Sequence, residues 1–305
     1  MNTRITIYAM SVLATLALVS CTKDGFERPS YSLETSTRLG KKIVEGTEGY
    51  FGHVKSDTQK TLGAGVSLLD LSYLNMNGYS MQMYVYSVSL SSAAVTVLTP
   101  DNSASLGKVQ KLTEQASALS AFANVYGAIN GDSYIASNLQ PAGIVYRDGS
   151  AIKSTFSDSK GGFFATLKDG SAVIGTQDNY GVYRKSIQNA IGTRLQILKD
   201  GFFIPQSDTK AAARTAVAIS EDGMTVWFII VDGVYFYYSN GITYRDLARV
   251  MQACGASNGA VLESGDQTTA VIRDPMSDSG FSLLNLPSNK GLEQNVVNGL
   301  AIIQY

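Results

Sequence analysis

Four Asp-Gly pairs divide the middle of this chain into short apolar segments. They are Asp148-Gly149, Asp169-Gly170, Asp200-Gly201 and Asp222-Gly223. Both residue types tolerate the positive φ angles that tight turns between antiparallel strands require. Apolar runs of strand length, such as residues 81–90 and 94–98, alternate with polar turns. The pattern predicts a single α+β domain with a mostly antiparallel or mixed sheet and a few packed helices.

Two stretches have helical spacing instead. Between residues 112 and 126 apolar side chains recur on one helical face, and Gly127 can end that helix. A second helix is predicted over 244–254, where Thr243 and Asp246 form a capping-box arrangement at its start. Cys254 lies on the apolar stripe of this second helix, and the chain offers no histidine partner for it, so we expect a core residue and not a nucleophile.

The first 21 residues have the pattern of a bacterial lipoprotein signal peptide. Arg4 precedes an apolar stretch that is short for a membrane span, and a small residue precedes Cys21. Cys21 would then carry a lipid anchor in the membrane, and the protein would lie in the bacterial cell envelope, on the periplasmic side or at the cell surface. The alternative is an ordinary signal peptide that contains a cysteine by chance. With Cys21 modified, Cys254 has no partner for an internal disulfide.

Residues 22–64 are polar and show no sustained apolar period, which predicts a tether with one small ordered element at most. The folded domain would cover residues 65–305. His53, the only histidine, lies in this tether, so a Ser-His-Asp triad or a multi-histidine metal site lacks its parts. The 24 basic and 25 acidic residues leave a net charge of −1, without the basic surplus of a nucleic-acid-binding protein.

Polar residues stand at the ends of four predicted strands, where binding sites are commonly built. They are Asn130, the pair Arg214-Thr215, Asp232, and the loop that contains Glu263, Asp266 and Thr268. An arginine can make two parallel hydrogen bonds to a phosphate, and carboxylates can act as acid, base or nucleophile at an anomeric carbon. Taken singly, each has a structural explanation as an ion pair, a hairpin turn or a solvated loop. Together they are expected to meet at one rim of the sheet.

The order of these segments resembles the phosphodiester glycosidase family, from about residue 65 to residue 305. The matching segments are residues 128–131, 141–145, 190–192, 198–201, 214–216, 231–233, 238–243, 246–248 and 296–302. The resemblance implies hydrolysis of a sugar-1-phosphate linkage in a sugar-phosphodiester, with a carbohydrate or sugar-phosphate as the substrate and no cofactor. It assigns Asp232 and Glu263 as acid/base residues and Asn130, Arg214 and Thr215 as substrate-binding residues. Asp266 and Thr268 would bind substrate from the neighbouring loop.

The chain departs from the family at its signature Leu-Asp-Gly-Gly-Gly-Ser, which is replaced here by residues 262–267, Leu-Glu-Ser-Gly-Asp-Gln. Asp266 adds a side chain and a negative charge where glycine would let backbone amides approach a ligand. Asp132-Ser133-Tyr134 replace Gly-Phe-Phe, and Val234 stands where members often have arginine. Two alternatives therefore stay open. One is a non-catalytic glycan-binding or structural envelope lipoprotein that retains the scaffold, and the other is a calcium or magnesium site formed by Asp132, Asp232, Glu263 and Asp266.

The aromatic run of residues 235–238, Tyr-Phe-Tyr-Tyr, indicates strand or hairpin packing. Stacking of one of these rings on a sugar is the alternative.

Overall fold

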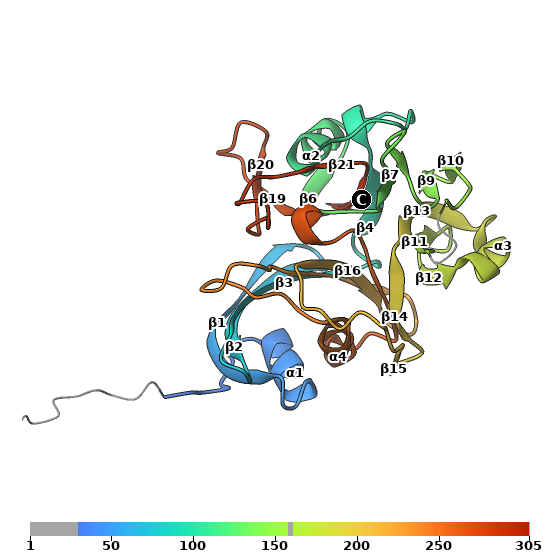
Figure 1. Ribbon diagram of the computed structural model, residues 1–305. Coiled ribbons are helices and arrows are strands. Elements are labelled where there is room, and N and C mark those ends of the chain that lie inside the picture. The colour runs from blue at the N-terminus through green and yellow to red at the C-terminus, as the bar shows by residue number, and fades with distance from the viewer. Residues whose placement is uncertain (1–29, 158–160, 305) are drawn as a thin grey trace, which may run out of the picture. The chain divides into compact units, whose positions relative to one another are not determined.

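The computed structural model describes residues 30–157 and 161–304, and all described helices and strands belong to the compact unit that begins at Tyr31 (Figure 1). The predicted signal peptide with Cys21 and residues 22–29 of the predicted tether lie outside the described residues. Among the residues that are described, no helix is both long and apolar enough to cross a membrane.

The largest element is an eight-stranded antiparallel sheet. Its strand order is β1 (Phe51–Gly63), β2 (Val66–Asn75), β3 (Ser80–Ser89), β17 (Thr225–Val231), β16 (Arg214–Ile219), β18 (Asn258–Val261), β14 (Leu195–Lys199) and β15 (Phe202–Phe203). Its two faces carry different apolar clusters because neighbouring residues of a strand point to opposite sides.

Among the described residues, the other sheets are two five-stranded antiparallel sheets and two short strand pairs. One sheet has the order β10 (Ser150–Lys153), β9 (Val145–Arg147), β13 (Ile187–Thr193), β11 (Gly162–Leu167) and β12 (Ala172–Thr176). The other has the order β20 (Phe281–Leu283), β19 (Ala270–Arg273), β6 (Asn124–Asn130), β22 (Gly299–Gln304) and β4 (Ala94–Leu98). The pairs are β21 (Asn295–Val296) with β5 (Gln110–Lys111), and β7 (Tyr134–Ile135) with β8 (Gln140–Pro141).

Each Asp-Gly pair joins two neighbouring antiparallel strands, as predicted. The four turns connect β9 to β10, β11 to β12, β14 to β15, and β16 to β17. In the first of them, Asp148 and Gly149 have φ angles of 52° and 77°. The fold is α+β and mostly sheet, and every strand pair in the described part of the chain is antiparallel.

The helices are α1 (Arg38–Gly46), α2 (Leu112–Ser120), α3 (Tyr180–Tyr183) and α4 (Tyr244–Cys254), with short 3₁₀ turns η1 (Pro100–Asn102), η2 (Gln177–Asn179) and η3 (Gly265–Gln267). Helix α4 has the predicted bounds, and the Thr243 side chain accepts a hydrogen bond from the Asp246 backbone N–H. Cys254 is buried in the core, and burial raises the pKa of its thiol to about 12. The Cys254 thiol is therefore a poor nucleophile near neutral pH.

The predicted helix over residues 112–126 is wrong beyond Ser120. Residues from Asn124 onward form β6, which pairs with both β19 and β22 in the centre of its sheet. Phe122, which the helical period placed on the buried face, is 79% exposed. Pairing on two sides of β6 therefore outweighs the local helical period.

The predicted tether over residues 22–64 is also corrected, because its second half is folded. Helix α1 contributes Ile43 and Val44 to the cluster that it shares with α4, and β1 forms the edge of the large sheet. Both oxygens of Asp57 on β1 accept backbone N–H groups just before α1, at 2.6 and 2.7 Å. A strand at the edge of a sheet needs few apolar residues, which is why the segment shows no strong period.

Helices α1 and α4 cover one face of the eight-stranded sheet, and the two five-stranded sheets cover the other (Figure 1). The start of β16 and the ends of β17 and β18 lie at one rim of the large sheet, because β16 is antiparallel to both neighbours. β6 ends at the same rim, since Asn130 of β6 bonds to Thr215 of β16.

Candidate functional site

Arg214 and Thr215 are neighbours in the chain, but they point to opposite faces of the large sheet. Ala216 on β16 belongs to the apolar cluster between the large sheet and helices α1 and α4. Val217 belongs to the apolar cluster on the other face, between the large sheet and the five-stranded sheets. By alternation, Arg214 shares the face of Ala216, and Thr215 shares the face of Val217. Arg214 and Thr215, both expected to bind substrate, are therefore not placed to bind one phosphate group together.

Arg214 is buried beside helix α4. Its guanidinium lies over the Tyr244 ring, 3.9 Å from the ring centre, and one terminal nitrogen donates to the Tyr244 hydroxyl at 2.8 Å. The other terminal nitrogen donates to the Lys210 carbonyl at 3.1 Å and lies 3.8 Å from an Asp208 carboxylate oxygen. In this arrangement Arg214 anchors the start of β16 to α4.

Asn130 is the centre of a buried hydrogen-bond network on the Thr215 face. Its side-chain oxygen accepts from the Thr215 hydroxyl at 2.6 Å and from the Thr269 backbone N–H at 3.0 Å. Its side-chain nitrogen donates to the Glu263 carbonyl at 2.8 Å. One amide thus ties together the end of β6, the start of β16 and both ends of the loop of residues 263–269.

Asp232 lies on the same face as Thr215 and is fully buried. Its two carboxylate oxygens accept from the Asn285 side chain at 2.8 Å and from the Leu286 backbone N–H at 3.0 Å. The same Asn285 nitrogen donates to the Thr268 carbonyl, so Asp232 is joined indirectly to the loop after β18. Burial raises the pKa of Asp232 to about 6, although these hydrogen bonds act in the opposite direction.

Glu263 lies at the edge of an open hollow of about 360 Å³. Ser133, Tyr134, Glu263, Ser264, Asp266 and Gln267 line it. One carboxylate oxygen of Glu263 accepts from Arg194 at 3.0 Å and from the Ser264 backbone N–H at 3.1 Å. Asp266 is exposed at the hollow. The hollow therefore combines the carboxylates of Glu263 and Asp266 with hydroxyl groups, and the exposed Arg194 binds the Glu263 carboxylate.

Asp132 is a second carboxyl group beside the hollow, and it is buried. Burial raises the pKa of Asp132 to about 7, and the negative charge of Glu263 acts in the same direction. A backbone hydrogen bond from Gly143, at 2.6 Å, opposes this shift only partly. Near neutral pH a substantial fraction of Asp132 is therefore protonated.

Two glycines make room for the Asp132 carboxyl group. A Cβ atom at Gly192 on β13 would collide with the Asp132 side chain and would lie 2.7 Å from the Gly143 Cα atom. The Asp132 backbone N–H donates to the side-chain oxygen of Asn298 at 2.8 Å, which fixes the chain as it leaves β6. A Cβ atom at Gly143 would in turn lie 2.5 Å from the Gly192 Cα atom, so the close packing of these two segments around Asp132 requires glycine at both positions.

Several buried polar atoms near these groups have no hydrogen-bond partner within the described residues. They are the hydroxyl oxygens of Thr268 and Thr269, the side-chain oxygen of Gln267 and the side-chain nitrogen of Asn298. Unpaired buried polar atoms cost free energy, and such costs are often retained at functional sites.

The alternative of a calcium or magnesium site is not supported. In residues 30–157 and 161–304, no group of three or more His, Cys, Asp or Glu side chains is arranged to hold a metal ion. Asp232 is engaged with Asn285 and Leu286, whereas Asp266 faces the solvent. The four carboxylates proposed for the cation therefore do not converge.

The structure brings Asn130, Thr215 and the loop with Glu263 and Thr268 into one network, places Asp266 at its outer edge, and joins Asp232 through Asn285. It leaves Arg214 on the other face. Sequence reasoning missed Arg194 and the partnership of Asn285 with Asp232. Arg194 could have been noticed, because it lies two residues after residues 190–192, which match the family pattern. No matching segment or motif marks Asn285.

A family model described as phosphodiester glycosidase matches residues 123–303, which include every residue of the hydrogen-bond network and of the hollow. A sequence search of curated proteins finds no match.

Several solved structures are similar in fold. The catalytic domain of zebrafish N-acetylglucosamine-1-phosphodiester alpha-N-acetylglucosaminidase, auto-inhibited by its pro-peptide, has a TM-score of 0.61 and 16% identity, over 82% of this chain and 88% of that one. A hypothetical protein from Synechocystis has a TM-score of 0.57 and 12% identity over 82% of this chain, which spans only 64% of that protein. A putative exported protein from Burkholderia pseudomallei has a TM-score of 0.55 and 12% identity, over 74% of each chain. At these identities the likeness concerns the fold.

Proposed function

The chain belongs to the phosphodiester glycosidase family, and on that basis we propose that it hydrolyses a sugar-phosphodiester at the hollow beside Glu263. Water would add to the anomeric carbon of the sugar, the bond from that carbon to the phosphate oxygen would break, and a phosphate monoester would leave. The observation that carries the proposal is the ion pair, at 3.0 Å, between the Arg194 guanidinium and the partly exposed carboxylate of Glu263, which lines the hollow.

The chemistry of the leaving group fits these residues. A phosphate monoester has a second pKa of about 6, so near neutral pH its departure needs a positive charge more than a proton. Arg194 supplies a planar, permanently charged group for this purpose. The Glu263 carboxylate can take a proton from the attacking water.

Asp132 would supply a carboxyl group close to the hollow that is partly protonated near pH 7, because its pKa is raised to about 7. Its nearest link to the hollow is Ser133, whose hydroxyl lies 3.5 Å from an Asp132 oxygen and which lines the hollow. Asp232 and Asn130 would act as positioning residues, because their hydrogen bonds hold the loop that carries Glu263 and Thr268.

The test uses the chain from residue 22 onward, which contains the whole compact unit. It is incubated with a panel of sugar-1-phosphodiesters, and the released phosphate monoester is measured. Glu263→Gln should lower kcat by about 100-fold or more, and Arg194→Ala should raise KM. Glu221→Gln is the matched control, because Glu221 is exposed in the turn between β16 and β17, at the opposite end of β16. The proposal fails if no panel member is hydrolysed or if Glu263→Gln retains full activity.

A second candidate is a glycan-binding envelope protein that retains the scaffold without turnover. One observation favours it: Asp266 places a negative charge at the hollow, where a phosphodiester would also be negatively charged. Binding of a panel member to the hollow without release of phosphate would establish this alternative.

We propose, in addition, that the mature protein is anchored in the bacterial envelope through a lipid on Cys21. The apolar stretch before Cys21 supports this proposal. Labelled palmitate should be incorporated into the wild-type chain and not into Cys21→Ala, with Cys254→Ala as the control. Equal labelling of Cys21→Ala would exclude the anchor.

A further inference from the structure

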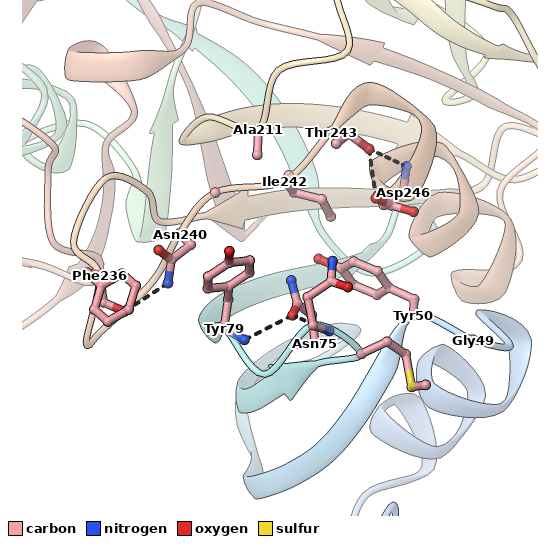
Figure 2. Close-up of a pocket in the computed structure, with 13 residues that line it drawn as sticks. Gly49, Tyr50, Asn75, Tyr79, Ala211, Phe236, Asn240, Ile242, Thr243 and Asp246 are labelled. Atoms are coloured by element: carbon pink, nitrogen blue, oxygen red, sulfur yellow. Dashed lines mark hydrogen bonds between the residues drawn. The ribbon is translucent and has the colours of Figure 1, made fainter.

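A second hollow, of about 590 Å³, lies at the same rim of the large sheet but toward the face that carries α1 and α4. Three segments form most of it: the connection from α1 to β1, the turn from β2 to β3, and residues 236–246 leading into α4; Ala211, shortly before β16, completes the lining (Figure 2). We call it the aromatic groove. It shares no lining residue with the hollow beside Glu263.

Aromatic rings are presented to solvent in this groove. Tyr79 is 45% exposed and Phe236 is 62% exposed, and their rings meet edge to face with centres 6.3 Å apart. Figure 2 shows the Tyr79 ring between the side chains of Asn75 and Asn240. Exposed rings of this kind offer flat apolar surfaces to a ligand, while the neighbouring amides offer hydrogen bonds.

The two asparagines keep part of their hydrogen-bonding capacity free. The Asn75 side-chain oxygen accepts from the backbone N–H groups of Asn77 and Tyr79, both at 3.0 Å, and its side-chain nitrogen has no partner within the described residues. The Asn240 side-chain nitrogen donates to the carbonyls of Ser80 and Phe236, and its side-chain oxygen has no partner there. The groove thus offers one donor and one acceptor from fixed amides, beside the rings.

Hydrogen bonds from the asparagine side chains to the backbone, together with one β-bridge, fix the segments of the groove. Asn75 fixes the turn that carries Tyr79, and Asn240 ties the Phe236 segment to β3. Ile242 pairs with Ala212 as an isolated β-bridge. A groove that is already ordered loses little entropy when a ligand binds.

The charges of the lining favour a neutral ligand. No lysine or arginine lines the groove, and its one carboxylate is that of Asp246. One Asp246 oxygen accepts from the Thr243 hydroxyl at 2.7 Å, and the other lies 3.7 Å from Arg249. A phosphate or sulfate group would meet only this negative charge, so an anionic ligand is disfavoured.

We propose that the aromatic groove binds a neutral oligosaccharide. Pyranose rings have apolar C–H faces that stack on Tyr79 and Phe236, and hydroxyl groups that bond to the free amide atoms of Asn75 and Asn240. This site goes beyond the proposed hydrolysis, because it would hold neutral glycan whether or not the hollow beside Glu263 turns over a phosphodiester. It also assigns a binding role to Phe236, one of the aromatic residues 235–238 that follow Asp232.

The test measures binding alone, by calorimetric titration of the chain from residue 22 with neutral hexasaccharides of glucose, mannose and N-acetylglucosamine. An oligogalacturonate of the same length is the anionic probe. Tyr79→Ala and Phe236→Ala should each weaken binding of the best neutral probe by about tenfold. Phe202→Ala is the matched control, because Phe202 is an aromatic residue that is 76% exposed and does not line the groove.

Thermal melting of each variant is compared with that of the wild type, so that a lost fold is not taken for lost binding. The proposal is overturned if no neutral probe binds, if the oligogalacturonate binds more tightly, or if Phe202→Ala has the same effect as Tyr79→Ala. It is also overturned if the chain self-associates through this surface, seen as a dimer that Phe236→Ala dissociates. Absence of hydrolysis would refute the proposed reaction and leave the binding result unaffected.

Discussion

Replacing Asp132 by asparagine should remove much of the pH dependence of stability that this carboxyl group causes. Its pKa is raised from 3.8 to about 7 in the folded chain, mainly by burial. Between these two values the folded state holds a proton that the unfolded state has lost. The contribution of Asp132 to the free energy of unfolding therefore falls as pH rises from about 4 to about 7 and is constant above that.

The size of the effect follows from the difference of about three pH units. Each unit corresponds to about 1.4 kcal/mol, so an ionised Asp132 costs up to ~4 kcal/mol above pH 7. Asparagine keeps an oxygen that can accept from the Gly143 N–H and carries no charge to bury. Asp132→Asn should thus resemble the wild type near pH 4 and exceed its stability by up to ~4 kcal/mol at pH 8.

The assay is urea unfolding of wild type and variant at intervals from pH 4 to pH 8.5. The pKa of Asp232 is also raised, to about 6, so Asp232 adds its own pH dependence to the stability of the wild type. The informative quantity is therefore the difference in free energy of unfolding between variant and wild type at each pH. Asp266→Asn is the control, because Asp266 is exposed, and its curve should run parallel to that of the wild type. If the Asp132→Asn curve also stays parallel to the wild type at every pH, the burial argument is refuted.

The packing around this site gives two further predictions. Gly192→Ala should destabilise the fold by about 1–3 kcal/mol, because the new Cβ atom would collide with Asp132. Gly181→Ala, at a position with nothing within 4 Å, should cost far less in the same thermal melts, and equal costs would contradict the steric reasoning. Asn130→Ala removes three buried hydrogen bonds and should cost about 2–4 kcal/mol, more than Thr215→Val, which removes one of them. Urea unfolding checks the order, and a larger loss for Thr215→Val would show that Asn130 is not the centre of the network.

Features set by short stretches of sequence were predictable. The Asp-Gly turns depend on the backbone freedom of two residues, and α4 depends on Thr243, Asp246 and one apolar stripe. The first helix prediction went too far because residues 121–126 satisfy a helical period locally, while their pairing partners lie more than a hundred residues away in sequence. Strand β1 was missed for the related reason that an edge strand needs little apolar content.

For the candidate site, the sequence identified which strand ends matter but not which face each side chain takes. Both faces of β16 are buried, so its residues show no apolar alternation; the general alternation of side chains along a strand is what separates Arg214 from Thr215. Asn285 could not be found in this way, since only the folded chain places it between Asp232 and Thr268. The raised pKa of Asp132 likewise depends on burial over two glycines of distant segments.

The start of β16 connects the two hollows through the opposite faces of one strand. Thr215 bonds to Asn130, which holds the loop of the hollow beside Glu263, whereas Arg214 bonds to Tyr244, the residue that follows Thr243 at the edge of the aromatic groove. The same rim can therefore support a site for a charged phosphodiester and a site for neutral glycan, because the sheet separates their side chains.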